Sequence, residues 1–475
     1  MDKELLKKAE EYLEEQREQI KADLIRLVKI PSIESEAEEG APFGRKCREA
    51  LDEAIALYKE NGFEAEDKCG GKYGLASLKK GGEKTICLYG HTDVVPVSDG
   101  WVYTEPFEPI EINGTLIGRG VEDNKSGVIA SLYIGKMIKG LGLELKNNLN
   151  VFLGSSEETG MADIMAFKEN EKMPDLSIVP DNCFPVCVGE KGICHFWAKS
   201  EKTLSDIISV VGGSAFNVVL DKATAKIRYS EDAFEELEKI VSKNKRLELS
   251  LENGELVLTA LGIAKHAAHP EGSLNAAYIL SEAISSLKTI NESDREIFTA
   301  ARDLLKTPYG EIYGIDIVDP DFGPLTIANG MIKTENAKLY ISFDMRYGSV
   351  ASGEELIGKI EKTLSSLSFK AEDIKNEAGY NTANDNPIAL KFKSIYEEIS
   401  GEEGTQNQRS SGGTYARYLS NAYSVGTTVP YMVAPVDMPE GHGECHQCDE
   451  CLFIDSFLEA IKIIFMMVVE ADKIL

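Results

Sequence analysis

Two histidines and several carboxylates in this sequence stand in short polar stretches of a kind that can bind metal ions. His91 directly follows an apolar run, and His446 lies far downstream, near the C-terminal end. The acidic residues that follow other apolar runs or lie in glycine-rich stretches between them are Asp93, Asp123, Glu157, Glu158 and Asp181. Imidazole and carboxylate groups are common ligands of Zn²⁺, although any one acid alone would more often be a solvated loop residue. Their recurrence at the ends of apolar runs favours a metal site.

The adjacent pair Glu157 and Glu158 is the most informative of these acids. Two neighbouring carboxylates at the end of a strand repel each other unless a cation lies between them or one of them is protonated. The pair therefore indicates either a cation beside it or a protonated glutamate.

Three cysteines near the C-terminal end offer a rival metal site. Cys445, Cys448 and Cys451 are spaced C-x2-C-x2-C beside His442 and His446, and such spacing occurs in structural zinc and iron–sulfur sites. No second CxxC pair occurs elsewhere in the chain. Inert or redox-sensitive thiols are the other interpretation, and both stay open at this stage.

Apolar runs and turn signals place the histidine and the acids at the ends of predicted strands. Runs at 85–89, 150–153 and 176–179 predict buried strands, and helical spacing predicts helices over 3–28, 47–60 and 128–138. Asn113-Gly114 between apolar pairs predicts a hairpin over 109–118. Open α/β sheets bind ligands at the carboxyl ends of their strands. This alternation of strands and helices therefore predicts an α/β domain with the polar stretches gathered at one edge of its sheet.

The pattern changes near Glu190. Short strands are expected at 194–198, 256–260 and 337–345, interleaved with helices near 233–242, 274–287 and 353–367, and two further helices are expected at 388–399 and 452–471. We therefore expect one α/β domain formed by residues 1–189 and 376–475, with a mixed sheet flanked by helices, interrupted by an inserted α+β domain at 190–375.

Composition and charge exclude several classes of partner. The 475 residues include 51 Lys+Arg and 79 Asp+Glu, a formal net charge of −28, and so acidic a surface repels nucleic acid and anionic membranes. The first 29 residues lack the apolar stretch of a signal peptide. The apolar segment 452–469 contains Asp455, Glu459 and Lys462, so it predicts a buried helix and not a membrane span. Nine cysteines without a secretory signal are expected to be reduced, and a cytoplasmic location is expected.

Five stretches resemble the co-catalytic di-zinc exopeptidase superfamily, which includes dipeptidase V, carnosinase, carboxypeptidase G, aminoacylase and succinyl-diaminopimelate deacylase. These stretches are GHTDVVP (90–96), GRGVEDNKSG (118–127), GSSEETG (154–160), VPDNCFPV (179–186) and HQCDE (446–450). GIAKHAAHPEGSLN (262–275) resembles a family stretch in the inserted domain. Chain length, the size of the insertion and GGTYAR (412–417) are most similar to the dipeptidase V branch. The resemblance implies a zinc-exopeptidase-like catalytic domain interrupted by a lid domain.

The resemblance also implies two Zn²⁺ per chain, with Mn²⁺ or Co²⁺ as possible substitutes. The ligands it implies are His91 and Asp181 for one ion, Glu158 and His446 for the other, and Asp123 for both. Glu157 would be the general base, and Asp93 would lie behind His91 as its hydrogen-bonding carboxylate.

The inserted domain would supply residues that recognise the substrate. By resemblance, His266 donates to the oxyanion, although His269 three residues later is an alternative. Arg346 and Asn217 would contact the substrate, with Arg346 suited to bind its carboxylate; a surface ion pair is the other interpretation of Arg346. Gly412 and Gly413 would line the pocket with backbone N–H groups.

These residues together predict a metallopeptidase, specifically a dipeptidase that hydrolyses unblocked dipeptides through a hydroxide bridging two zinc ions. An N-acyl-amino-acid deacylase of the same superfamily is the alternative, and a non-catalytic ligand-binding protein is a remote one. A small peptide is the expected partner, and we expect a functional monomer, with His266 and Arg346 acting on the metal site of their own chain.

Overall fold

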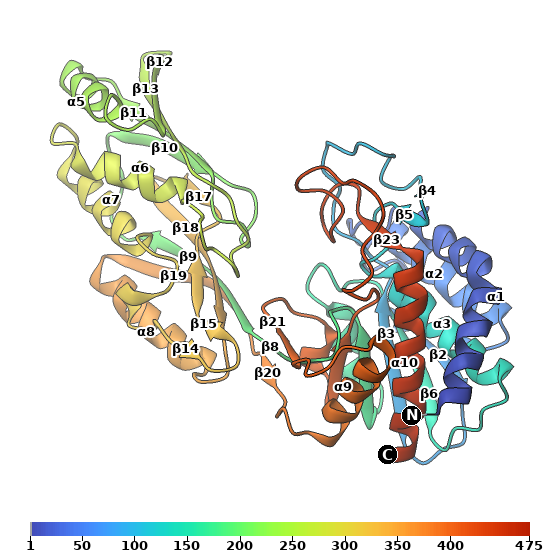
Figure 1. Ribbon diagram of the computed structural model, residues 1–475. Coiled ribbons are helices and arrows are strands. Elements are labelled where there is room, and N and C mark those ends of the chain that lie inside the picture. The colour runs from blue at the N-terminus through green and yellow to red at the C-terminus, as the bar shows by residue number, and fades with distance from the viewer. Residues whose placement is uncertain (1) are drawn as a thin grey trace. The chain divides into compact units, whose positions relative to one another are not determined.

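The chain forms two units in the computed structural model, which describes residues 2–475 (Figure 1). The first unit contains residues 2–189, Thr382–Gln408 and Thr414–Leu475, and the second contains Glu190–Asn381 and Arg409–Gly413. Each unit has its own hydrophobic core. The second unit extends beyond the expected boundary at residue 375 and takes in a five-residue segment from near the C-terminal end.

The central sheet of the first unit is mixed, and its parallel strands position the polar stretches. Strands β3, β6, β7 and β22 run parallel to one another, in the order β6-β3-β7-β22. β1 and β2 add antiparallel pairs at one side, and β8 pairs antiparallel with β22 at the other. The strands are β1 (Glu64–Lys68), β2 (Tyr73–Lys79), β3 (Thr85–His91), β6 (Asn148–Gly154), β7 (Leu176–Pro180), β8 (Cys187–Glu190) and β22 (Ala422–Val425). Because β6, β3 and β7 are neighbours and run the same way, the residues after their last positions meet at one edge.

Helices flank this sheet. Helix α3 is buried along almost all its length, as is α10. The helices of the first unit are α1 (Lys3–Val28), α2 (Arg45–Glu60), α3 (Lys125–Gly140), α4 (Ala162–Asn170), α9 (Pro387–Ser400) and α10 (Ile454–Ile474), with the 3₁₀ turn η2 (Tyr415–Tyr418). Within residues 2–475, no helix has both the length and the apolar content needed to cross a bilayer.

A small three-stranded sheet brings the end of the chain back toward its first third. Asn113 and Gly114 have φ values of 50° and 77°, as a type I′ hairpin turn requires, and they join β4 (Ile110–Ile112) to β5 (Thr115–Ile117). Strand β23 (Cys451–Phe453) pairs with β5 and places Cys451 opposite Ile117. The segment that carries His446 is thereby held beside the segment that carries Asp123.

The second unit is an antiparallel sheet with helices. Its strands follow the order β12-β13-β11-β10-β17-β18-β9-β19, with β16 also paired to β18. Its main strands are β9 (Gly192–Ser200), β10 (Ile207–Gly212), β11 (Lys222–Arg228), β12 (Leu247–Glu252), β13 (Glu255–Leu261), β16 (Thr326–Ala328), β17 (Ile332–Glu335), β18 (Lys338–Tyr347) and β19 (Phe369–Glu377). The helices are α5 (Glu231–Val241), α6 (Ala276–Ser286), α7 (Glu292–Leu304) and α8 (Gly353–Ser366), with the 3₁₀ turn η1 (Glu311–Tyr313). The short strands are β14 (Val318–Asp319), β15 (Gly323–Pro324), β20 (Tyr380–Asn381) and, crossing into the first unit, β21 (Gln408–Ser410).

The two faces of this second sheet differ in burial. Along β9 buried and half-buried residues alternate, as in a strand with one covered face. Figure 1 shows the helices on one side of the sheet. Arg346 pairs with Ile193 and Asp344 pairs with His195 across β18 and β9, so Arg346, Asp344 and His195 share the face opposite the buried Cys194 and Phe196.

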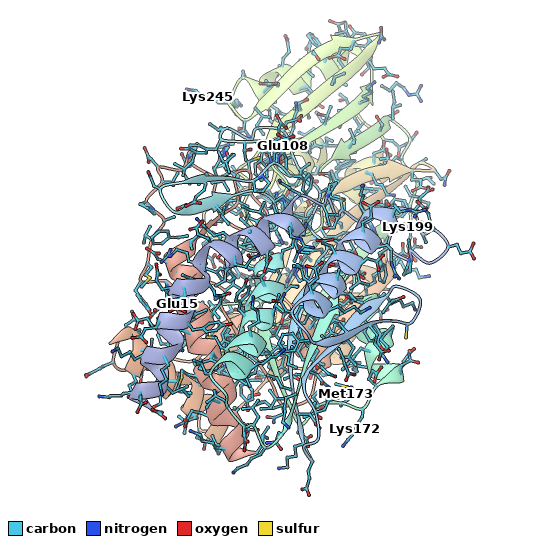
Figure 2. All side chains as sticks on the ribbon, turned by 90° about the vertical axis from the view of Figure 1, so that its right-hand side faces the viewer. Glu15, Glu108, Lys172, Met173, Lys199 and Lys245 are labelled. Atoms are coloured by element: carbon cyan, nitrogen blue, oxygen red, sulfur yellow. The ribbon has the colours of Figure 1, made fainter. Side chains whose placement is uncertain are left out.

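The predicted fold class, an α/β domain with a mixed sheet interrupted by an α+β domain, is confirmed, and two helices were not predicted. Helix α4 has only nine residues, so its sequence carries little helical periodicity. It also begins after Met161, whose positive φ is not a usual helix start signal. Helix α7 does have start signals, because Asn291 caps it and acids fill its first turn. Charged residues such as Glu15, Glu108 and Lys245 lie at the exposed surface (Figure 2), in keeping with the large net charge.

Candidate metal centre

The ends of three neighbouring strands bring most of the predicted ligands together. His91 is the last residue of β3, Glu157 and Glu158 follow β6, and Asp181 follows β7. His91 stands opposite Gly154 in the β3–β6 register. Asp123 reaches the same place from the turn before α3. All of these residues belong to the first unit.

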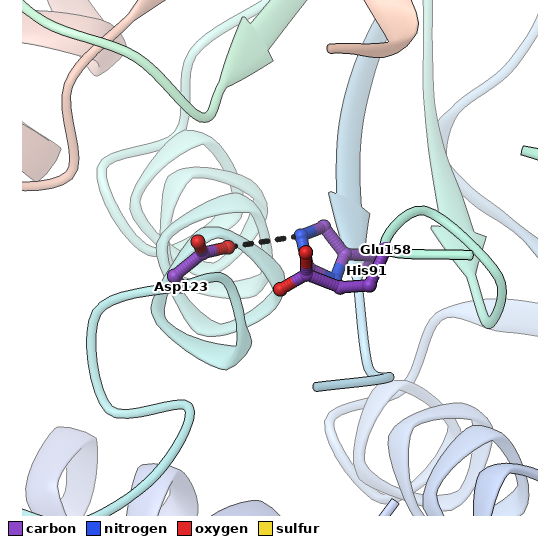
Figure 3. Close-up of side chains that lie close together, drawn as sticks. All are labelled: His91, Asp123 and Glu158. Atoms are coloured by element: carbon purple, nitrogen blue, oxygen red, sulfur yellow. Dashed lines mark ion pairs between the residues drawn. The ribbon is translucent and has the colours of Figure 1, made fainter. Parts of the chain in front are cut away.

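Asp123 lies between the two histidines. Its Oδ1 is 3.1 Å from His91 Nε2, and its Oδ2 is 3.0 Å from His446 Nε2. His91 Nε2 is also 3.8 Å from Asp181 Oδ2, and His446 Nε2 is 3.3 Å from Glu158 Oε2. Figure 3 shows His91, Asp123 and Glu158 pointing toward one another. One carboxylate facing two imidazoles in this way is the arrangement expected of a ligand shared by two ions.

Two overlapping groups of donor atoms could each hold a metal ion. One is His91, Asp123 and Glu158, and the other is His91, Glu157 and Asp181; in each group the donor atoms lie within 4.8 Å of one another. Glu157 was expected to be a base and not a ligand. It lies close enough to a possible metal position to take either role. The geometry brings all five expected ligands and the expected base into one cluster.

The chemistry of these side chains fits cations. His91 Nε2, Glu157 Oε1 and Glu158 Oε1 are buried, and none has a hydrogen-bond partner of acceptable geometry in the described part of the chain. A buried polar atom without a partner costs about 1–3 kcal/mol of stability, and a metal ion removes this cost. Nitrogen and carboxylate oxygen donors suit Zn²⁺, and Mn²⁺ also accepts them.

Electrostatics lead to the same interpretation. Burial and the nearby Asp181 carboxylate raise the pKa of Glu157 well above its usual value. Hydrogen bonds with Asp123 and Glu158 raise the pKa of His446 to about 11. Burial alone would raise the pKa of Asp123, but the two imidazoles outweigh it and hold that pKa well below its usual range. In the absence of metal, the negative charge of the clustered carboxylates must be balanced by protons and imidazolium groups. Bound cations would otherwise balance it.

Asp93 connects His91 to the loop after β6. Its backbone oxygen lies 3.0 Å from His91 Nδ1, and its Oδ1 lies 3.3 Å from the same nitrogen. Its Oδ2 accepts a hydrogen bond of 3.0 Å from the backbone N–H of Glu158. Asp93 therefore lies behind His91, as expected, and also orients the segment that carries the two glutamates.

Asn124 fixes the position of Asp181. Its Nδ2 donates to Asp181 Oδ1 at 3.0 Å and to the backbone oxygen of Pro180 at 2.5 Å. Gly127 makes room for it, because a Cβ there would stand 2.2 Å from Asn124 Oδ1. The amide thus links the turn before α3 to the end of β7.

Arg119 and Glu450 are buried residues that hold the segments carrying Asp123 and His446. Glu450 accepts hydrogen bonds from the backbone N–H groups of Gly120, Glu122 and Asp123, each at 3.0 Å. Arg119 donates to the backbone oxygens of His446 and Gln447 at 3.2 and 3.1 Å. Sequence reasoning did not assign a role to either residue, although both lie inside matched motifs and a charged residue in a glycine-rich motif was an available signal.

The three C-terminal cysteines lie outside both candidate groups of metal ligands in the described residues. Among the described residues, neither group of donor atoms that could hold an ion contains a cysteine. Cys448 Sγ lies 3.4 Å from Ser98 Oγ, whereas Cys445 and Cys451 line a separate cavity of about 450 Å³ with Glu122 and Met432. The interpretation as a structural zinc or iron–sulfur site is therefore not supported, and all nine cysteines are free thiols.

The expected substrate-recognition residues belong to the second unit. His266 is exposed and forms a bridge with Val218, and Ala267 N–H donates to the Asn217 oxygen at 2.8 Å, so Asn217 and His266 lie on adjoining backbone segments. The His266 and His269 rings are 6.5 Å apart, and His266 Nδ1 accepts a hydrogen bond of 3.2 Å from the Ala268 N–H.

Arg346 is 5% exposed and is held in a fixed orientation. Its Nε and Nη2 donate to the two oxygens of Asp344 at 2.6 and 2.8 Å, and its Nη1 donates to the backbone oxygen of Ser411 at 2.9 Å. His195 Nε2 lies 3.1 Å from Asp344 Oδ2. Arg346 is thus buried in a paired network and is not a surface ion pair. Through Ser411, it adjoins Gly412 and Gly413.

The chain is similar to known proteins in both sequence and fold. The chain is 29% identical over 432 residues to the "Putative dipeptidase" of Staphylococcus haemolyticus. The aligned region covers 88% of this chain and 91% of that protein. Among solved structures, it shares its fold with human carnosine dipeptidase 1 (TM-score 0.61, 15% identity, 99% of each chain). The dipeptidase Dug1p from Saccharomyces cerevisiae has the same fold (TM-score 0.60, 15% identity, 98% of each chain).

The family assignment follows from the sequence match as well as from the fold. The model described as Peptidase family M20/M25/M40 matches residues 87–470, a range that contains every candidate ligand, the whole second unit and most of the first. The resemblance inferred from the motifs is confirmed: the chain belongs to peptidase family M20/M25/M40, and it is a peptidase by family.

Proposed function

We propose that the protein is a metal-dependent dipeptidase that hydrolyses unblocked dipeptides, with two Zn²⁺ held by His91, Asp123, Glu158, Asp181 and His446. The observation that carries the proposal is the position of Asp123, whose two oxygens each lie within 3.1 Å of a different histidine. The relatives named as dipeptidases, together with their fold, support the choice of substrate.

Two zinc ions bound there would polarise the scissile carbonyl and make water acidic enough to react near neutral pH. Glu157 is then the proton carrier. It is 8% exposed and has one unpartnered oxygen within the cluster. We assign it to accept a proton from the attacking water and to return that proton to the amide nitrogen of the leaving residue.

Recognition of the substrate carboxylate is assigned to Arg346. A guanidinium has five N–H groups, and the contacts with Asp344 and Ser411 use three of them. One N–H on each Nη nitrogen is left for a carboxylate, whose geometry matches such a pair. His266, Asn217 and the N–H groups of Gly412 and Gly413 are proposed to contact the rest of the substrate.

The experiment that tests this function compares three substrates of the zinc-loaded protein. We expect hydrolysis of Ala-Leu, much slower hydrolysis of its C-terminal amide because Arg346 then has no carboxylate to bind, and none of N-acetylalanine. Arg346→Met should reduce kcat/KM for Ala-Leu and leave the slow rate on the amide unchanged. N-acetylalanine as the best substrate would establish a deacylase instead. Inertness of the metal-loaded protein toward all three would contradict both activities.

A further inference from the structure

Asp163 is a buried carboxylate that the proposed reaction does not use. Its side chain is 0% exposed, and no basic side chain pairs with it in residues 2–475. Four neutral donors surround it instead. Oδ2 accepts from the N–H groups of Ser155 and Ser156 at 2.8 and 3.0 Å and from the Tyr415 hydroxyl at 2.5 Å, and Oδ1 accepts from the Ile164 N–H at 2.7 Å. A charge buried at this cost needs a reason.

The segment that Asp163 binds is the one that carries the two catalytic-site glutamates. Ser155 and Ser156 directly precede Glu157 and Glu158, and Asp93 accepts from the N–H of Glu158 at 3.0 Å. Asp163 therefore holds the start of this loop and Asp93 holds its end. The Glu157 side chain leaves the backbone between these two anchors, so its direction depends on both.

Tyr415 completes the arrangement from a distant part of the sequence. Its ring is 0% exposed and lies perpendicular to the His91 ring, with centroids 6.3 Å apart, and edge-on to Phe152 at 5.2 Å. At Gly154, a Cβ would stand 1.9 Å from the Tyr415 hydroxyl and 2.8 Å from Asp163 Oδ2. The last residue of β6 is thus a glycine because this pair fills the space beside it.

We propose that Tyr415 and Asp163 are positioning residues of the metal centre: the Tyr415 hydroxyl orients the Asp163 carboxylate, which fixes the loop that presents Glu157 and Glu158. The inference rests on the proposed roles of these two glutamates. It predicts that losing the hydroxyl lets the loop move while substrate recognition by the second unit stays intact.

The test uses Tyr415→Phe with a matched control. Tyr133 is also fully buried in the first unit, and its hydroxyl donates to the buried Asp23 at 2.8 Å. Tyr133→Phe therefore removes a hydrogen bond of the same kind that involves no residue of the loop. For both variants the measurements are Zn²⁺ affinity by chelator competition, kcat and KM for Ala-Leu, and thermal unfolding of the zinc-loaded protein.

We expect Tyr415→Phe to lower kcat roughly 10- to 100-fold and to weaken Zn²⁺ binding roughly 10-fold or more, the range known for groups that orient metal ligands, with KM changed less than about threefold. Tyr133→Phe should leave kcat and Zn²⁺ affinity within about twofold of wild type. Asp163→Asn should resemble Tyr415→Phe. Equal effects of Tyr415→Phe and Tyr133→Phe on kcat and Zn²⁺ affinity would overturn the proposal.

The affinity measurement separates this inference from the proposed function. If the wild-type protein cleaves no dipeptide, the proposed function fails, yet a selective loss of Zn²⁺ affinity in Tyr415→Phe would still establish the positioning role. If dipeptides are cleaved and Tyr415→Phe binds Zn²⁺ and turns over like wild type, only the inference fails.

Discussion

Arg119 Nη1 lies 2.8 Å from Glu450 Oε2, and both side chains are buried, at 1% and 0% exposure. The pair joins two ligand-bearing segments, since Glu450 binds the N–H of Asp123 and Arg119 binds the backbone oxygen of His446. Removing one member of a buried ion pair leaves an uncompensated charge, which typically costs 3–5 kcal/mol.

Glu450→Gln should therefore lower the free energy of unfolding by about 3 kcal/mol and weaken metal binding as well. Urea unfolding with and without EDTA measures both effects. Glu4→Gln is the control, because Glu4 is 79% exposed where it pairs with Lys8 and such pairs contribute less than about 1 kcal/mol. If the Glu450→Gln protein is as stable as the Glu4→Gln protein, the ion pair between Arg119 and Glu450 does not contribute to stability.

Metal analysis should find about two Zn²⁺ per chain after reconstitution. EDTA should abolish dipeptide hydrolysis and lower the unfolding temperature, because the unpartnered donor atoms of His91, Glu157 and Glu158 then lose their cations. Zn²⁺, Mn²⁺ or Co²⁺ should restore part of the activity. Full activity with fewer than one metal per chain would contradict the two-ion centre.

Substitutions of Glu157 and Glu158 should affect different properties of the enzyme, turnover in one case and metal binding in the other. Glu157→Gln should keep both metals and lose about 10²–10⁴-fold in kcat, the usual size of a general base effect. Glu158→Gln should instead lower Zn²⁺ affinity, because Glu158 faces His446 and Asp123. Zinc titration and turnover on the same preparations decide the matter, and the opposite pattern would exchange the two roles.

Asp344 should make the second unit sensitive to acid. Burial alone would raise its pKa, but hydrogen bonds from Arg346 and His195 lower it to about 2, below the value near 3.9 of an unfolded chain. The stability it contributes is therefore fully present above about pH 5 and is lost progressively as the pH falls toward 1, a total of roughly 2–3 kcal/mol.

Asp344→Asn should abolish that part of the pH dependence. Unfolding can be followed by Trp197 fluorescence in a Trp101→Phe background, since the chain has two tryptophans and Trp197 lies on β9 of the second unit. Asp316→Asn, at an exposed position of the same unit, serves as control. Parallel pH profiles for Asp344→Asn and the control would refute the assignment.

Mixing two inactive proteins should not restore activity. His266 and Glu157 belong to different units of one chain, and we expect both to act on the same substrate in that chain. His266→Ala and Glu157→Gln proteins, each inactive alone, are mixed at equal concentration and assayed with Ala-Leu. Recovery of activity would mean that subunits share their sites.

The sequence predicted the centre better than the contacts that support it. His91, Glu157 and Asp181 each follow an apolar run, so local patterns locate them at strand ends. Tyr415 and Asp163 are 252 residues apart in the chain, and neither shows a local pattern that points to the other. Burial of such a pair depends on tertiary packing, which periodicity does not encode. The roles of individual ligands remain predictions, because proximity alone does not separate Glu157 from Glu158.

The segment from Ser411 to Tyr415 is held by a hydrogen bond at each end. Ser411 is bound by Arg346 in the second unit and Tyr415 by Asp163 in the first, with only Gly412, Gly413 and Thr414 between them. The backbone next to the arginine that is proposed to contact substrate therefore leads, a few residues later, to the tyrosine that is proposed to orient the glutamate loop. Between the two bound residues lie Gly412 and Gly413, and glycine is the residue whose backbone rotation is least restricted.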